Sequence, residues 1–211
     1  MANRTSSARF AWILLSCSIL PIGSSLQLRG QTLSGLQIGD DESKTTRLTG
    51  KPGQTDTYKT FTGRKWNLVN GNDLSVTTSA SGRIVYVESD WKGMSDETGC
   101  DRPRLRFGVT TLTELRKRLG SNGFGFKKRG LGMQTADGIV LFNAFEVGTA
   151  VVTFVTKVNL VEYRAAKDKD KSVKMGDFAR LDAISIADPE YAKSEWGDRT
   201  YDPTYKPVTW K

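Results

Sequence analysis

The chain contains no histidine among its 211 residues. This absence excludes the usual Ser-His and Cys-His nucleophile pairs and removes the commonest metal ligand of proteins. Acid-base chemistry would then depend on paired carboxylates, lysine or tyrosine, and no carboxylate pair stands out. We therefore predict a protein that is not an enzyme, with no catalytic residues, no cofactor and no metal site. A hydrolase that uses paired carboxylates is the third hypothesis, behind two kinds of binding protein.

The chain also has only two cysteines and no long hydrophobic run. If Cys17 is removed with an N-terminal segment, Cys100 is the only thiol, so no intramolecular disulfide can form. The longest apolar run, Phe10–Ile22, is shorter than the roughly 20 residues that span a bilayer. We expect a fold stabilised by packing alone and no transmembrane span in the mature chain.

Residues 1–25 have the pattern of a secretory signal peptide. Arg4 and Arg9 form a positive start, the apolar run follows, and residues 23–25 are small enough for cleavage. The pattern predicts a periplasmic or secreted protein. A second interpretation is a lipid anchor on Cys17, because residues 14–17 resemble a lipoprotein processing box.

The charge of the chain is positive. The formal net charge is +8, and loss of Arg4 and Arg9 with the signal peptide would lower it by two. This excess is moderate and spread along the sequence, which is typical of a soluble basic surface. It favours acidic protein faces, anionic lipid or acidic glycan as partners, and we predict no nucleic-acid partner.

One sequence pattern occurs twice. Residues 36–39 and 105–108 each open a short helical pattern, and each pattern ends in Gly-x-x-Gly, at residues 50–53 and 120–123. The spacing of about 70 residues is too long for an ordinary solenoid, so two tandem half-domains are the better interpretation. The predicted boundaries are a first unit at 26–93, a linker at 94–104 and a second unit at 105–187.

The first unit is predicted to hold a weak helix and an antiparallel meander. The helix spans residues 42–48, where two β-branched threonines weaken it and Gly50 ends it. Strands are expected at 64–69, 74–78 and 83–89, because turn residues that tolerate positive φ separate them.

The second unit repeats this order more clearly. Residues 111–114 form a capping box for a helix with leucines at i, i+3 and i+7. Strands are expected at 139–147, 150–157 and 180–187, with an inserted, solvated segment at 158–178. Residues 188–211 are expected to be an irregular aromatic tail that lies partly against the body. The predicted fold class is α+β, with two tandem helix-plus-antiparallel-sheet units in one composite domain.

This tandem order resembles the architecture of the β-lactamase inhibitor protein. The single unit resembles the small lipoprotein of the outer-membrane assembly machinery (SmpA/OmlA type), where Gly108, Thr110, Leu119 and Gly120 fill comparable places. The resemblance implies an inhibitor or an envelope adaptor. The chain departs from both families, because a lone Cys100 cannot form the inhibitor's disulfides and the lipoprotein's N-terminal cysteine is lost if the signal peptide is cleaved.

The predicted strands carry apolar side chains on both faces, and large exposed apolar patches are uncommon on soluble monomers. Either the two halves or the tail cover these faces, or a partner does. We predict an exported protein-binding module, and the alternative is a binder of anionic envelope polymers or lipids. The predicted partner-binding residues are Trp66, Tyr86, Phe142, Glu146 and Phe154, with Lys127, Lys128 and Arg129 as an electrostatic rim.

Overall fold

The computed structural model describes residues 31–49, 51–100, 105–206 and 208. The predicted signal peptide and Cys17 lie outside these residues, as do residues 26–30 of the predicted first unit and residues 101–104 of the predicted linker. In the described part of the chain, four α-helices accompany one antiparallel sheet of ten strands. The α+β class is therefore confirmed, whereas the sheet is continuous and does not divide into two separate units.

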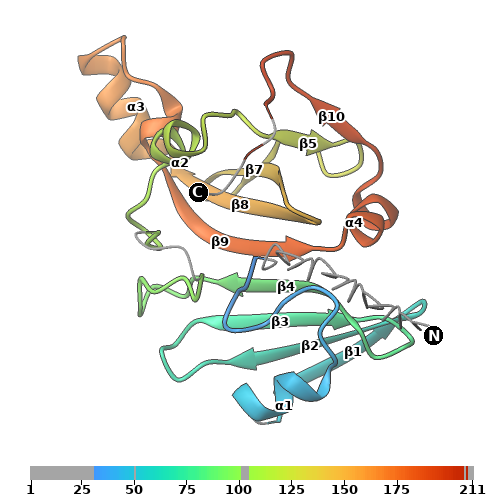
Figure 1. Ribbon diagram of the computed structural model, residues 1–211. Coiled ribbons are helices and arrows are strands. Elements are labelled where there is room, and N and C mark those ends of the chain that lie inside the picture. The colour runs from blue at the N-terminus through green and yellow to red at the C-terminus, as the bar shows by residue number, and fades with distance from the viewer. Residues whose placement is uncertain (1–30, 50, 101–104, 207, 209–211) are drawn as a thin grey trace, which may run out of the picture.

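The sheet follows the order β1-β2-β3-β4-β9-β8-β7-β5-β10, with β6 paired to β7. Figure 1 shows the first four strands below and the later strands above, meeting where β4 lies beside β9. Its strands are β1 Gln54–Tyr58, β2 Phe61–Asn67, β3 Asp73–Thr78, β4 Ile84–Asp90, β5 Phe124–Phe126, β6 Gly132–Thr135, β7 Gly138–Val147, β8 Ala150–Asn159, β9 Ala179–Ala187 and β10 Arg199–Tyr201.

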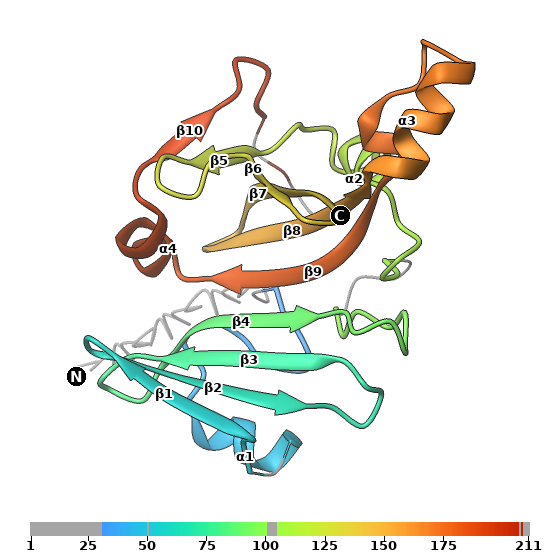
Figure 2. The same cartoon turned by 180° about the vertical axis from the view of Figure 1, so that it is seen from behind.

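The helices lie at the margins of the sheet. They are α1 Ser43–Thr49, α2 Leu112–Leu119, α3 Leu160–Lys169 and α4 Pro189–Trp196, with a short 3-10 helix at Met175–Asp177. The view from behind in Figure 2 shows α3 and α4 at opposite ends of β9.

The capping box predicted for the second helix is confirmed. The Glu114 backbone N–H donates to Thr111 Oγ1 at 3.2 Å, and the Thr111 N–H donates to Glu114 Oε2 at 2.9 Å. Leu112 and Leu115 are buried on the inner side of α2, and Gly120 ends the helix with a φ of 62°. The helix therefore forms because its first N–H groups are satisfied and its leucines share one face.

Rows of opposed residues show how the sheet divides its two faces, because directly opposite residues in antiparallel strands point to the same side. One row runs Val87, Ile186, Val152 and Phe145 across β4, β9, β8 and β7. All four are buried in the largest apolar cluster, which also contains Leu115 of α2. We call this side the core face and the opposite side the second face.

Gly39 and Gly108, which lie at the start of the two predicted units, form similar hydrogen bonds with the sheet. The Gly39 N–H donates to the carbonyl of Ile84 on β4, and the Gly108 N–H donates to the carbonyl of Leu181 on β9, both at 2.8 Å. Both glycines have positive φ, at 87° and 66°. A Cβ on Gly108 would overlap the ring of Trp91, so this turn needs glycine for space as well as for its backbone conformation.

The sequence prediction was wrong in the inserted segment and in the tail. Asn159 ends β8 and caps α3, because its side-chain oxygen accepts hydrogen bonds from the N–H groups of Val161 and Glu162. Residues 160–169 of the expected inserted segment are therefore helical. The tail is not irregular throughout, since it forms α4 and β10. Three short strands, β1, β5 and β6, were not predicted.

Phe154 tests the assignment of the core face. Its side chain has no exposed surface and its ring packs edge-to-face on Phe145 at 5.7 Å between centroids. We expect Phe154→Ala to lower the free energy of unfolding by about 3 to 5 kcal/mol, the usual cost of such a cavity. Urea titration measures this loss. Val161→Ala, at a side chain that is 78% exposed, serves as the control, and equal stability of the two variants would contradict the assignment.

Candidate binding surface

The C-terminal segment folds back over the second face of the sheet. Asp188 begins this segment, since its carboxylate accepts hydrogen bonds from the N–H groups of Glu190 and Tyr191 at 2.9 and 3.1 Å. Pro189 at the first helical position fits this helix start because it has no N–H to satisfy. The chain then leaves α4 and adds β10 to the edge strand β5.

Aromatic rings fill the contact between this segment and the sheet. Trp196 packs on Tyr86 and on Phe126, with centroid distances of 5.9 and 5.2 Å. Tyr201 and Tyr205 pack on Phe124 at 5.3 and 5.6 Å. We call these six rings, together with Tyr191, the aromatic cover. Tilted and edge-to-face contacts of this kind contribute about 0.5 to 1.5 kcal/mol per pair beyond their burial.

Glu146 fastens the end of this segment to β7. Its carboxylate forms an ion pair with Arg199 and accepts a hydrogen bond from the Tyr205 hydroxyl at 2.9 Å. The Tyr201 hydroxyl donates to the same carboxylate at 3.4 Å. Glu146 was predicted to contact a partner, and in this structure its contacts are internal.

Arg129 lies between two rings at the border of the aromatic cover. Its guanidinium carbon is 4.0 Å from the centroid of Phe142 and 4.6 Å from that of Trp196. The planar guanidinium suits such a stacked position. Lys127 and Lys128 precede it and are exposed, and Lys127 pairs with Asp198 at 3.1 Å.

The structure separates the eight predicted binding residues into two groups. Trp66 is 3% exposed and Phe154 is fully buried, both on the core face. We therefore assign these two to the core and remove them from the contact surface. The other six belong to the second face or its border. They are Tyr86, Lys127, Lys128, Arg129, Phe142 and Glu146.

Sequence reasoning missed the role of the residues that complete this surface. Trp196 and Arg199 bring the C-terminal segment onto the sheet, yet neither was a predicted site residue. The tail rings were expected to cover apolar surface, which the aromatic cover confirms in outline. The signal for α4 was present, because Asp-Pro followed by an acidic residue is a typical helix start.

A polar row crosses the centre of the second face. Glu88 on β4 lies opposite Ser185 on β9, and Ser185 lies opposite Thr153 on β8. Burial raises the pKa of the Glu88 carboxyl to about 7, and the neighbouring Asp90 adds to the rise. A hydrogen bond from Tyr86 and the charge of Arg129 act in the opposite direction. Glu88 is therefore partly protonated near neutral pH.

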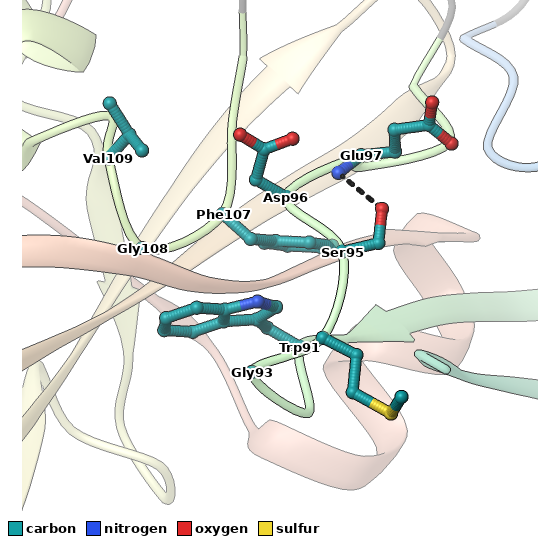
Figure 3. Close-up of a pocket in the computed structure, with 9 residues that line it drawn as sticks. Trp91, Gly93, Ser95, Asp96, Glu97, Phe107, Gly108 and Val109 are labelled. Atoms are coloured by element: carbon teal, nitrogen blue, oxygen red, sulfur yellow. Dashed lines mark hydrogen bonds between the residues drawn. The ribbon is translucent and has the colours of Figure 1, made fainter. Parts of the chain in front are cut away.

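A surface hollow of about 490 Å³ lies beside the Gly108 turn. Figure 3 shows the rings of Trp91 and Phe107 one above the other next to Gly108, with Asp96 and Glu97 at the rim. Arg106 already pairs with Asp96 through its Nε, at 2.6 Å. We place the principal site on the second face instead, where Arg129 stacks between Phe142 and Trp196.

Comparisons with known proteins give only distant structural likenesses. No protein-family model matches the sequence, and no curated protein matches it. A cysteine-rich secretory protein from Staphylococcus aureus is similar in structure, with a TM-score of 0.49 and 10% identity over 80% of this chain and 51% of that one. A DUF4309 family protein from Bacillus subtilis has a TM-score of 0.42 and 14% identity, over 73% of this chain and 82% of that one. The chain spans about half the length of the staphylococcal protein.

The predicted resemblance to the β-lactamase inhibitor protein and to the SmpA/OmlA-type lipoprotein is wrong. The matching structures belong to other groups of proteins, and neither likeness assigns a function to this chain. The motifs behind the resemblance are short. A glycine after a leucine-rich turn, such as Gly120 with its left-handed backbone, is a common way to end a helix in many folds.

The part of the chain that the structure describes contains no helix with the length and apolar character needed to cross a bilayer. Within the same residues, no group of three or more potential metal-ligating side chains comes together.

The raised pKa of Glu88 predicts a pH-dependent stability. The folded state binds this proton more tightly than the unfolded state, whose pKa is near 4.5. The contribution of Glu88 is therefore most favourable below pH 4.5 and is lost as the pH rises to about 7. We expect Glu88→Gln to be more stable than the wild type by about 2 kcal/mol at pH 8, since each pKa unit corresponds to about 1.4 kcal/mol and the half-buried site keeps some solvent.

Urea titration at pH 4 and pH 8 measures this difference. The two proteins should have nearly equal stability at pH 4. A difference between them that is the same at both pH values would show that Glu88 has an ordinary pKa.

Proposed function

We propose that this protein is an exported, non-catalytic protein-binding module. Its contact surface is the outer side of the aromatic cover together with the basic rim of Lys127, Lys128 and Arg129. The observation that carries this proposal is the stacking of Arg129 between Phe142 and Trp196, beside two exposed lysines. Tryptophan, tyrosine and arginine are the residue types that dominate the energy of protein interfaces.

The exposed parts of this surface support an acidic protein partner. The Lys127 side chain is 67% exposed, and Tyr201 is 47% exposed. Lys128, the next residue along the chain from Lys127, is also exposed. A positive rim of this kind attracts acidic faces and increases the rate of encounter.

Export is proposed from the sequence of residues 1–25, which lie outside the described residues. Arg4, Arg9 and the apolar run that follows them support a signal peptide. The alternative is that the exported protein is anchored to a membrane by a lipid on Cys17.

We also propose that the two predicted units, residues 26–93 and 105–187, are related tandem copies. The similar hydrogen bonds of Gly39 and Gly108 to the last strand of each half support this proposal. So does the central pairing of β4 with β9, which brings corresponding strands of the two halves together. The central pairing would then give two related units a common second face.

Charge reversal on the basic rim tests the protein-binding proposal. We expect Lys127→Glu/Lys128→Glu to lower the recovery of the bound partner at least about tenfold in affinity capture from the envelope fraction, because it opposes an acidic partner. The fold should survive, since an exposed pair such as Lys127 with Asp198 contributes at most about 1 kcal/mol.

The matched control is Lys169→Glu/Lys171→Glu, because both lysines are exposed near α3 and Lys171 also pairs with an aspartate, Asp168. Quantitative mass spectrometry compares the captured proteins. Retention of every captured protein by the rim variant would contradict the proposed surface.

Binding of anionic envelope polymers or lipids is the second candidate, and the positive net charge favours it, because the value of +8 for the full chain falls only to +6 without Arg4 and Arg9. If binding depends on net charge alone, the rim variant and the α3 control variant should lose the same amount of affinity. That affinity should also fall steeply as the salt concentration rises. Retention on heparin resin therefore separates the two candidates, because a specific protein interface responds only to the rim variant.

A further inference from the structure

A second surface hollow lies at the other end of β9 from α4, below the base of α3. Its volume is about 390 Å³, within the range of small-ligand sites. Its lining includes two rings, three acids and two bases. They are Trp91, Phe178, Asp137, Glu162, Asp182, Lys157 and Arg180.

A bulge in β9 builds this hollow. Val155 lies opposite Ala183 and Thr156 lies opposite Leu181, so Asp182 is the extra residue of its strand. The backbone carbonyl of Asp182 accepts a hydrogen bond from the backbone N–H of Trp91 at 2.8 Å. Bulges commonly redirect a side chain at a functional site. Here Asp182, the bulged residue, and Trp91 both line the hollow.

The charged groups of the hollow are only partly paired. Asp137 forms an ion pair with Lys157 at 2.7 Å. In the described chain, no residue forms a hydrogen bond or ion pair with the side chain of Asp182 or of Arg180. Burial raises the pKa of Asp182, and Lys157 opposes the rise. Asp182 therefore offers an acceptor and Arg180 offers a donor that a ligand can use.

The unpaired groups indicate the chemistry of the ligand. Asp182 needs a donor and Arg180 needs an acceptor, and a hydroxyl group is both. The rings of Trp91 and Phe178 offer flat apolar surface beside them. Three acids and two bases line the hollow, so a strongly charged polymer of either sign would meet like charges there.

Strand addition by a peptide does not fit this place. β8 is paired with β7 and β9, and β9 is paired with β4 and β8, so neither strand has a free edge. A ligand in this hollow must therefore be bound by side chains. We propose that the hollow between Trp91 and Asp182 binds a neutral saccharide, with Asp182 and Arg180 as the hydrogen-bonding pair and Trp91 as the stacking surface.

Titration of the full chain tests this proposal with three probes, which are maltohexaose, cellohexaose and N-acetylchitohexaose. NMR follows the indole N–H signal of Trp91, assigned with Trp91→Phe. We expect at least one probe to shift this signal at millimolar concentration. Asp182→Ala and Arg180→Ala should each weaken binding by about tenfold or more, because each removes one of the two polar contacts.

The control is Asp168→Asn, at an exposed aspartate beyond the hollow, which should leave the affinity unchanged. Circular dichroism checks that each variant is folded. No shift with any of the three probes would overturn the proposal, as would binding that survives both substitutions. A shift caused by the dipeptide Ala-Gly alone would replace the saccharide with a zwitterionic ligand. The result is independent of the aromatic cover, because α4, which carries part of that cover, lies at the opposite end of β9 from α3 (Figure 1).

Discussion

The pairing of β4 with β9 is the constraint on which the rest of the structure depends. Five residue pairs, from Tyr86 opposite Ala187 to Asp90 opposite Ala183, join the first four strands to the later ones. Because opposite residues point to the same side, this pairing continues both faces across the whole sheet. Without it, the apolar row through Val87 and Ile186 would be divided, and two small sheets would each bury too little surface to be stable.

The same pairing accounts for the second face. It places Tyr86 where Trp196 of the C-terminal helix can reach it, and it places Glu88 in a central polar row. β8 is buried on both faces over most of its length, so a cover on the second face is a physical requirement. The aromatic cover meets that requirement and leaves a basic rim at its border. The packing of the aromatic cover on the sheet therefore buries the second face and also forms the proposed binding surface.

The sequence predicted the elements whose signals are local. The capping box at Thr111 and the alternating strands around Phe145 and Ala183 were predicted close to their observed bounds. The short strands β5 and β10 were not, because three-residue strands form only when a distant partner is already in place. Trp66 and Phe154 were assigned to the contact surface for a similar reason. Alternation along a strand shows that it has two faces, but it does not show which face the tail will cover. The bulge at Asp182 could not be predicted from the sequence either, because a bulge depends on the register of two strands.

Native-state hydrogen exchange of the full chain tests the central pairing most directly. The amides of Val87 and Glu88 in β4 and of Ile184 and Ile186 in β9 are the informative probes. If the pairing makes the sheet one cooperative body, these amides exchange with the same, largest free energy of opening as those of β8. Exchange of β1–β4 at a clearly lower free energy, with β7–β9 still protected, would show two independent halves and contradict this account.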